Sequence, residues 1–202
     1  MDDIPECLEV RPMNPNKLIY DWNVIDYEIN RNPANHPHEV WFDDETLRDG
    51  LQSPSARNPS IEQKIELLSY MERLGIQKVD LGLPGAGPFH REHISAMLSH
   101  ISEHDYQIRP GAAVRTLMHD IEPLVEMQQE HGMEIQASAF LGTSPIRQYT
   151  EGWTMEKLIS TMEKAVSYAV ENEVPVMFVT EDTTRSNPED VKAIYQRAME
   201  LG

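Results

Sequence analysis

The segment from Phe42 to Pro54 carries the side chains in this chain that are best suited to chemistry. It reads as the end of a short strand followed by a glycine-containing turn, and it presents Arg48, Asp49 and Gln52 within a few residues. In α/β proteins catalytic residues gather at the carboxyl ends of strands. Adjacent arginine and aspartate side chains there can supply a fixed cation for an oxyanion and a hard oxygen ligand for a divalent metal. A strand-end salt bridge beside a turn would use the same residues, so the segment alone leaves both interpretations open.

Charge and composition narrow the possible partners. The chain has 17 Lys+Arg against 34 Asp+Glu, a formal net charge of −17, and no basic cluster that would offset this locally. A net negative charge of this size argues against nucleic acid and anionic membranes as partners. No apolar run approaches the roughly 18 residues of a membrane span, and the acidic N-terminus does not resemble a secretory signal. With Cys7 as its single cysteine, we expect a soluble cytoplasmic protein. A small anionic substrate would then need a local positive site.

The elements that would position these residues alternate from residue 41 onward. Five apolar β-type runs, each followed by a helix-period segment, predict strands near Val40–Phe42, Gln77–Leu83, Ile108–Val114, Glu134–Leu141 and Pro175–Thr180.

Capping residues mark several of the expected helices. Ser60 with Gln63 forms a capping box, and Gly75 ends that helix. Further helices are expected from about Asp120 to Gly132, from a Thr154 cap, and from Asn187-Pro188 to the chain end. A helix carrying Ile94, Met97, Leu98 and Ile101 follows the second strand.

Five such units fit the start of a TIM (β/α)8 barrel. They average about 32 residues each, and eight would need about 260 residues. The chain thus ends where a sixth strand would be expected. A five-stranded open sheet of the flavodoxin type is the alternative. We divide the chain into an N-terminal extension, residues 1–40, which is rich in Pro and Asn, and a partial barrel, residues 41–202.

Three motifs in order resemble one family. Thr46–Gln52 (T-L-R-D-G-L-Q) is similar to the first-strand signature of the metal-dependent acyl-CoA condensing enzymes, which include 2-isopropylmalate, homocitrate and citramalate synthases. Phe140–Pro145 (F-L-G-T-S-P) resembles the fourth-strand motif of that family, and Phe178–Ser186 (F-V-T-E-D-T-T-R-S) resembles the fifth-strand motif. The resemblance covers roughly residues 40–202 and implies a TIM barrel of the α/β class.

The resemblance also implies an activity and roles for residues. Acetyl-CoA, as co-substrate, would condense with a 2-oxo acid on a divalent metal (Mg²⁺, Mn²⁺ or Zn²⁺), followed by thioester hydrolysis; we expect a homo-oligomer. Asp49 matches the metal ligand, while Arg48 matches the cation that stabilises developing negative charge. Glu181 is the fifth-strand carboxylate, a candidate for substrate binding or proton transfer. The substrate-binding positions implied are Gln52, Thr143 and Ser144.

Three departures from the family pattern bear on this interpretation. The other metal ligands of the family form a His-x-His pair on a strand beyond residue 202, so residues 1–202 alone are expected to bind metal weakly. Ser138 occupies a fourth-strand position where the family usually has His or Asp. Met177 stands where a homocitrate synthase would have Arg, and this favours a branched or short aliphatic 2-oxo acid, as in isopropylmalate or citramalate synthesis.

Two other functions stay open. A non-catalytic partial barrel could act as a subunit or interaction module, because its edge strands would be unpaired. A related carbon–carbon lyase would share the Arg-Asp pair. His36 and His38 have His-x-His spacing, but they lie before the first expected strand, where a solvated loop is the simpler interpretation. Gly82–Gly87 lacks the lysine of a phosphate-binding loop and is expected to be a tight turn.

Overall fold

The computed structural model describes residue 18 and residues 40–202. The expected N-terminal extension therefore lies almost wholly outside the described residues, as do His36 and His38. Structural statements below refer to the described part of the chain.

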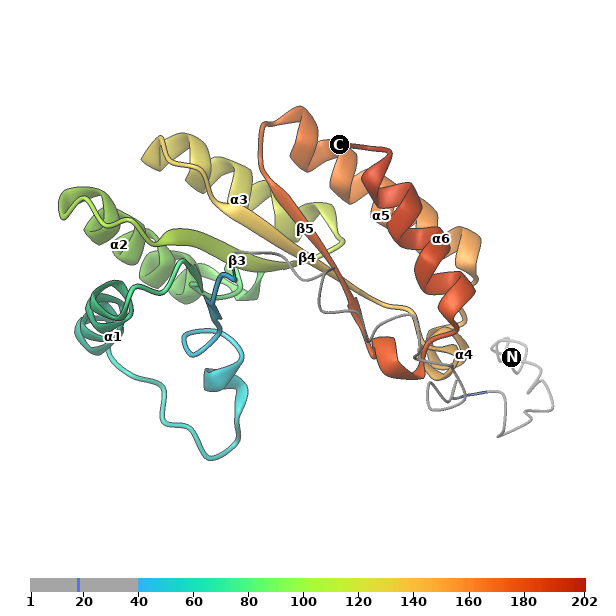
Figure 1. Ribbon diagram of the computed structural model, residues 1–202, viewed down its shortest axis with the longest axis horizontal. Helices are drawn as coiled ribbons and strands as arrows, with labels where there is room; N and C mark the ends of the chain where they lie inside the picture. Colours follow the sequence, from blue (N-terminus) through green and yellow to red (C-terminus); the bar gives the residue numbers. More distant parts are fainter. Residues whose placement is uncertain (1–17, 19–39) are drawn as a thin grey trace, which may run out of the picture.

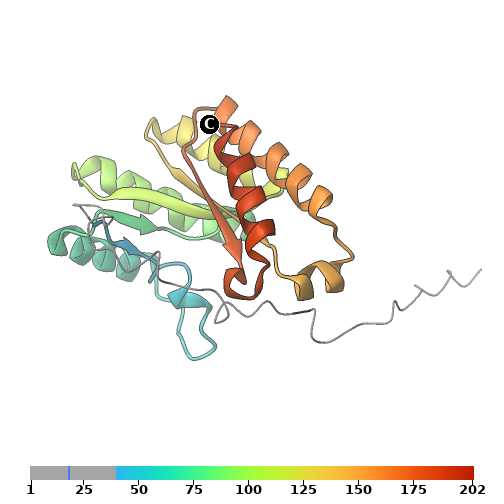
Figure 2. The same cartoon turned by 45° about the vertical axis from the view of Figure 1, so that its right-hand side comes forward.

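The chain forms one parallel sheet in which each strand lies beside its predecessor. Its strands are β1 (Asp43–Asp44), β2 (Lys78–Asp80), β3 (Arg109–Arg115), β4 (Gln136–Gly142) and β5 (Val176–Glu181), in the order β1-β2-β3-β4-β5. The sheet curls instead of lying flat (Figures 1 and 2). A flavodoxin-type sheet has the order 2-1-3-4-5, so the open-sheet alternative is wrong. The prediction of an α/β fold with the first five units of a TIM barrel is confirmed.

The helices form a layer on one side of the curled sheet (Figure 1). They are α1 (Ile61–Leu74), α2 (Pro88–Glu103), α3 (Met118–His131), α4 (Pro145–Glu151), α5 (Met155–Glu171) and α6 (Pro188–Met199), with 3-10 turns η5 (Gly50–Gln52), η6 (Pro84–Ala86) and η7 (Thr183–Arg185). Within the layer α1 contacts α2, α2 contacts α3, α3 contacts α5 and α5 contacts α6. Along residues 40–202 no helix combines the length and apolar character needed to cross a bilayer.

The expected helix caps are confirmed. The Ser60 hydroxyl accepts from the Gln63 N–H at 3.4 Å, and the Gln63 side chain accepts from the Ser60 N–H at 3.0 Å. Gly75 ends α1 in the left-handed region at φ 74°, where a residue with a Cβ would be strained. Thr154 and Asn187 cap α5 and α6 through their side-chain oxygens.

Three expected boundaries were wrong or incomplete. The first strand lies at Asp43–Asp44, and the apolar run Val40–Phe42 that suggested it is exposed. Helix α4 was not expected, although Ser144 followed by Pro145 is a helix-opening pair. Helix α6 ends at Met199, before the last residues of the chain.

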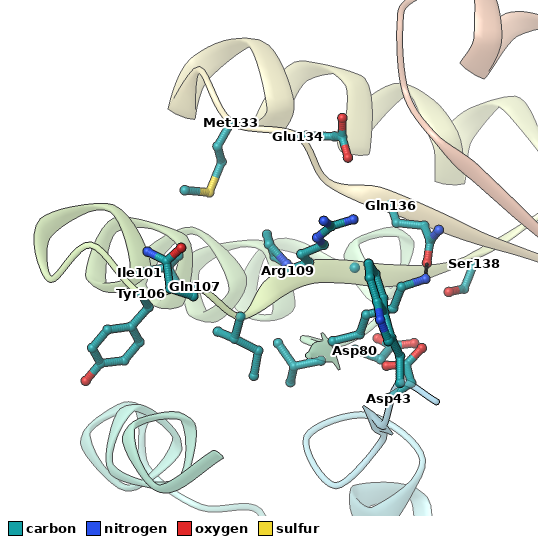
Figure 3. A pocket seen from close by; sticks show the side chains of 16 residues that line it. Asp43, Asp80, Ile101, Tyr106, Gln107, Arg109, Met133, Glu134, Gln136 and Ser138 are labelled. Atoms are coloured by element: carbon teal, nitrogen blue, oxygen red, sulfur yellow. Dashed lines mark hydrogen bonds between the residues drawn. The ribbon is translucent and has the colours of Figure 1, made fainter. Parts of the chain in front are cut away.

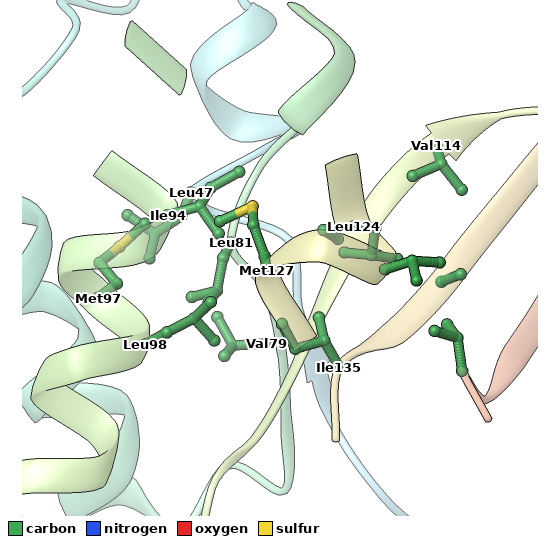
Figure 4. Packing of buried hydrophobic residues seen from close by; sticks show 14 of the residues in the cluster. Leu47, Val79, Leu81, Ile94, Met97, Leu98, Val114, Leu124, Met127 and Ile135 are labelled. Carbon is green, nitrogen blue, oxygen red and sulfur yellow. The ribbon is translucent and has the colours of Figure 1, made fainter. Parts of the chain in front are cut away.

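Strand alternation separates a core face from an inner face. One face of the sheet packs under the helices, where Val79, Val114 and Ile135 belong to the same buried cluster as Leu98 and Leu124 (Figure 4). Fully burying a side chain of this size contributes roughly 1.5–3 kcal/mol. The inner face, which includes Ser138, Phe140 and Met177, has no helix layer and is lined by pockets. Within residues 40–202, side chains on this face therefore line cavities and not the packed core.

Candidate active site at the carboxyl ends of the strands

A pocket of about 610 Å³ opens on the inner face toward the carboxyl ends of the strands. Side chains from the β1 turn, the end of β2 and strands β3 to β5 surround it: Glu45, Arg48, Gln52, Leu83, Ala113, Ser138, Phe140, Met177, Val179 and Glu181. Four of these are large and apolar, and the charged members lie on β5 and in the β1 turn. In TIM barrels this end of the sheet carries the active site.

Backbone hydrogen bonds shape the turn after β1. The Glu45 carbonyl accepts from the N–H groups of Arg48 at 3.1 Å and Gly50 at 3.0 Å, and the Asp44 carboxylate accepts from the Thr46 N–H at 2.8 Å. Leu47 is buried in the core. Because Leu47 anchors the turn, its neighbour Arg48 is directed to the pocket instead.

Three carboxylates surround the Arg48 guanidinium, one at each nitrogen. Nη2 is paired with Glu45, Nη1 lies 3.3 Å from Asp49 Oδ1, and Nε lies 3.3 Å from Asp80 Oδ2. Burial disfavours the charged form of Arg48, but the negative charges of Glu45 and Asp80 outweigh this and raise the pKa of the guanidinium. Arg48 is therefore a permanent cation beside the pocket.

Asp80 is the site residue that sequence reasoning missed. Its side chain is only 2% exposed, and its Oδ1 accepts from the N–H groups of Gly82 at 3.0 Å and Ala113 at 3.3 Å. Burial, with the nearby Glu45 charge, raises the pKa of Asp80 to about 6, although the backbone donors and Arg48 act in the opposite direction. The available signal was a lone acidic residue within the apolar run Val79-Asp80-Leu81.

The structure brings together three of the expected site residues. Arg48, Gln52 and Glu181 line the same pocket although they come from opposite edges of the sheet. Asp49 is not among the residues that line it; its carboxylate is 66% exposed and lies beside Arg48.

The two fourth-strand hydroxyls make local contacts. The Thr143 hydroxyl is buried and lies 2.8 Å from the Ser186 hydroxyl. Ser144 caps α4 by accepting from the Arg147 N–H at 3.3 Å, and it lines a shallow pocket of about 480 Å³ that shares Glu181 with the first pocket. Both residues therefore stabilise the β4–α4 connection beside the site.

A divalent metal is not accommodated by the described residues alone. Residues 40–202 contain no group of three or more His, Cys, Asp or Glu side chains placed to hold an ion. Asp49 offers one exposed carboxylate, whereas Mg²⁺ and Zn²⁺ sites need several ligands.

A second pocket, of about 400 Å³, lies toward the amino ends of the strands (Figure 3). The Arg109 guanidinium stacks on Trp41, 4.4 Å from the ring centre, and Lys78 Nζ donates to Gln136 Oε1 at 3.0 Å. Asp80 borders this pocket, and Ser138 borders both pockets. In TIM barrels this end of the sheet serves stability, so we place the candidate site at the opposite end.

Comparison with known proteins identifies the family of this chain. The family described as HMGL-like matches residues 39–202, which is most of the chain. The chain belongs to the HMGL-like family. Within it, the chain is 28% identical over 167 residues to 2-isopropylmalate synthase of Sediminispirochaeta smaragdinae, covering 82% of this chain and 32% of that protein. It is 31% identical over 168 residues to 2-isopropylmalate synthase of Microcystis aeruginosa, covering 82% and 31%.

A homocitrate synthase is also similar. Homocitrate synthase AksA of Methanocaldococcus jannaschii is 27% identical over 173 residues, covering 85% of this chain and 40% of that protein. The chain thus spans about a third of the length of the curated relatives it matches.

A solved structure supports the fold. HMG-CoA lyase from Brucella melitensis superposes with a TM-score of 0.60 at 16% identity, covering 82% of this chain and 59% of that one. At that identity the likeness concerns the fold alone.

Proposed function

We propose that this HMGL-like chain supplies the first five βα units of an acyltransferase that condenses acetyl-CoA with a small 2-oxo acid. The supporting observation is the pocket in which Arg48, Gln52 and Glu181 face one cavity at the carboxyl ends of the strands. Similar proteins named 2-isopropylmalate synthase and homocitrate synthase support the reaction class.

Each pocket residue has a role in this proposal. The Arg48 cation stabilises the negative charge that develops on oxygen when the acetyl carbanion attacks the keto carbon. Gln52 hydrogen-bonds the 2-oxo acid, and Glu181 binds substrate or transfers a proton. Thr143 and Ser144 hold the β4–α4 connection beside the shallow pocket of about 480 Å³. Asp49 would supply one ligand to a divalent ion, which would need its other ligands from outside residues 40–202 and would serve as a Lewis acid for the keto group.

The apolar wall of the pocket supports an aliphatic substrate. Leu83, Phe140, Met177 and Val179 line it together. A charged distal group on the 2-oxo acid would be left there without a partner, which is costly. We therefore propose a branched or short aliphatic 2-oxo acid, as in isopropylmalate or citramalate synthesis, acting in a cytoplasmic homo-oligomer.

The test is a condensation assay on the protein as its own cell makes it. Intact mass spectrometry of the immunopurified protein first establishes how long that protein is. The protein is then given acetyl-CoA, Mn²⁺ and a panel of 2-oxo acids, and release of the CoA thiol is followed. We expect turnover with branched or short aliphatic acids and much less with 2-oxoglutarate. Absence of thiol release with every acid, from folded protein with metal present, contradicts the proposal.

Arg48→Ala in the same protein tests the assigned role. Removal of a group that stabilises an oxyanion lowers turnover by about 10²-fold or more. Arg57→Ala is the matched control, because Arg57 is exposed in the loop before α1 and should leave turnover unchanged. Near-normal turnover of Arg48→Ala would remove Arg48 from the mechanism.

One observation favours a second function, that of a non-catalytic subunit. Strands β1 and β5 are the two edges of the described sheet, and both leave backbone groups unpaired on their outer sides. Such edges accept strands from other chains. Light scattering of the 202-residue chain over a range of concentrations tests this function: mass that grows with concentration supports it, and a constant monomer counts against it.

A further inference from the structure

The three carboxylates that surround the Arg48 guanidinium differ in solvent exposure. Glu45 and Asp49 face its two terminal nitrogens, and their side chains are 38% and 66% exposed. Asp80 faces Nε from inside the protein and is 2% exposed. The three contacts are therefore not equivalent, since two partners can move into solvent and one cannot.

The two carboxylate oxygens of Asp80 have different surroundings. Its Oδ1 accepts two backbone N–H groups, from Gly82 at 3.0 Å in its own strand-end turn and from Ala113 on β3 at 3.3 Å. Its Oδ2 is buried and makes no hydrogen bond among the described residues, and the same holds for Arg48 Nε, 3.3 Å away. Two buried polar atoms without hydrogen bonds are costly unless each is the partner of the other. The side chain of Asp80 therefore orients its free oxygen toward Arg48.

An anionic ligand at Arg48 must displace one or more of the carboxylates. Three negative partners more than compensate the single positive charge, so a fourth anion is not attracted while all three remain in place. The partners that can leave are Glu45 and Asp49, which expose the two Nη atoms when they turn outward. Two Nη atoms on one edge match the two oxygens of a carboxylate.

We propose that Asp80 is the positioning residue for Arg48: its buried carboxylate holds Nε while Glu45 and Asp49 give way to an anionic ligand at the Nη atoms. The inference rests on the proposed function in that the ligand is the carboxylate or developing oxyanion of a 2-oxo acid. The position of the guanidinium, however, is a property of the free chain and can be measured without substrate.

NMR of the arginine side chains of the 202-residue chain tests the proposal. The Arg48 Nε–Hε signal is assigned by its loss in Arg48→Lys. We expect Asp80→Asn to shift this signal and to speed its hydrogen exchange about tenfold or more, because the variant removes the charge but keeps an acceptor for the two backbone donors. Glu45→Gln should leave the Nε–Hε signal in place. Asp105→Asn is the matched control, since Asp105 is exposed and its φ of 53° suits Asn.

The outcomes separate the two proposals. An unchanged Nε–Hε signal in Asp80→Asn, or an equal effect of Glu45→Gln, overturns the role of Asp80. If Asp80→Asn does not fold, the unaltered chain still decides: Arg48 Hε must exchange about tenfold or more slowly than that of exposed Arg57, and equal rates overturn the inference. Oxalate, which mimics a 2-oxo acid, is then added. A response of the Arg48 Nη signals supports anion binding at the guanidinium. Silence there with a positive Asp80 result overturns the anion-binding part of the inference and leaves the positioning role standing, and the condensation assay tests the proposed function separately.

Discussion

The contact between Asp80 and Arg48 follows from the fold and not from the local sequence. In the sequence it is a single acid between Val79 and Leu81, and no spacing rule connects it with Arg48. Parallel pairing of β1 with β2 sets Asp44 beside Val79, so Asp80 comes to lie next to the turn that carries Arg48. Arg48, Gln52 and Glu181 could be predicted because motifs contain them, whereas Asp80 required the strand register.

The raised pKa of Asp80 predicts a pH-dependent stability effect. With a folded pKa of about 6 against an unfolded value near 3.8, the native state retains a proton between about pH 4 and 6 that the unfolded state has lost. Stability attributable to this group therefore falls as pH rises through that window. Asp80→Asn cannot ionise, so its free energy of unfolding relative to the unaltered chain should increase from pH 4.5 to pH 7.5, by roughly 2 kcal/mol.

Urea unfolding of both proteins at the two pH values measures this difference. Glu45 and Arg48 are the charged groups that act on Asp80, and Asp43, Lys78 and Arg109 line the pocket that Asp80 borders. All of them are identical in the two proteins. Their own titrations therefore largely cancel in the comparison. A pH-independent difference would mean that Asp80 ionises as an ordinary exposed carboxyl.

Elements were predicted well where local signals are strong and poorly where they are weak. The Ser60–Gln63 capping box and the Asn187-Pro188 start are backbone hydrogen-bonding patterns that a sequence displays directly. Strand β1 spans only two residues, and the apolar run that precedes it is exposed, so apolar content misplaced it. Thr143 and Ser144 were expected at the substrate, but their contacts with Ser186 and with the α4 backbone depend on how β4, α4 and η7 pack.

The packing of η6 against α3 gives a prediction at the scale of elements. A Cβ at Gly85 would clash with Asp120 Oδ1, and Asp120 is fully buried and held by the Arg115 side chain at 2.6 and 2.7 Å. Because the carboxylate cannot retreat, Gly85→Ala should destabilise the chain by about 1–3 kcal/mol. Gly50→Ala is the control: its Cβ would meet nothing closer than 3.7 Å, and its stability should change little.

Urea unfolding midpoints of the two alanine variants decide this point. Equal midpoints for Gly85→Ala and the unaltered chain would show that the β2–α2 connection shifts to make room. In that case the Arg115–Asp120 pair does not fix the carboxyl end of β3 as rigidly as its hydrogen bonds indicate.

At the scale of the whole molecule, five strands supply only part of the wall that a complete barrel would have. The inner face is lined by two pockets that share Ser138, and the sheet ends at β1 and β5. The superposed HMG-CoA lyase chain is matched over 59% of its length. The fold could be predicted from the βα alternation, because each unit carries its own signals. A site assembled from many strands could be predicted only in the part that these five strands supply.

The affinity of the 202-residue chain for a divalent metal should be low, because five strands supply only part of a barrel site. Asp49 is one exposed carboxylate, and no set of three ligating side chains forms within residues 40–202. The 202-residue chain should therefore bind Mn²⁺ no more tightly than about 1 mM, as expected when few ligands are supplied. Electron paramagnetic resonance of free Mn²⁺ measures this, with Asp49→Asn as the comparison.

Micromolar binding that survives Asp49→Asn but is lost in a His36→Ala, His38→Ala variant would place the metal at that pair, away from Arg48. Micromolar binding that Asp49→Asn abolishes would mean that the strand-end site recruits ligands from the first 39 residues.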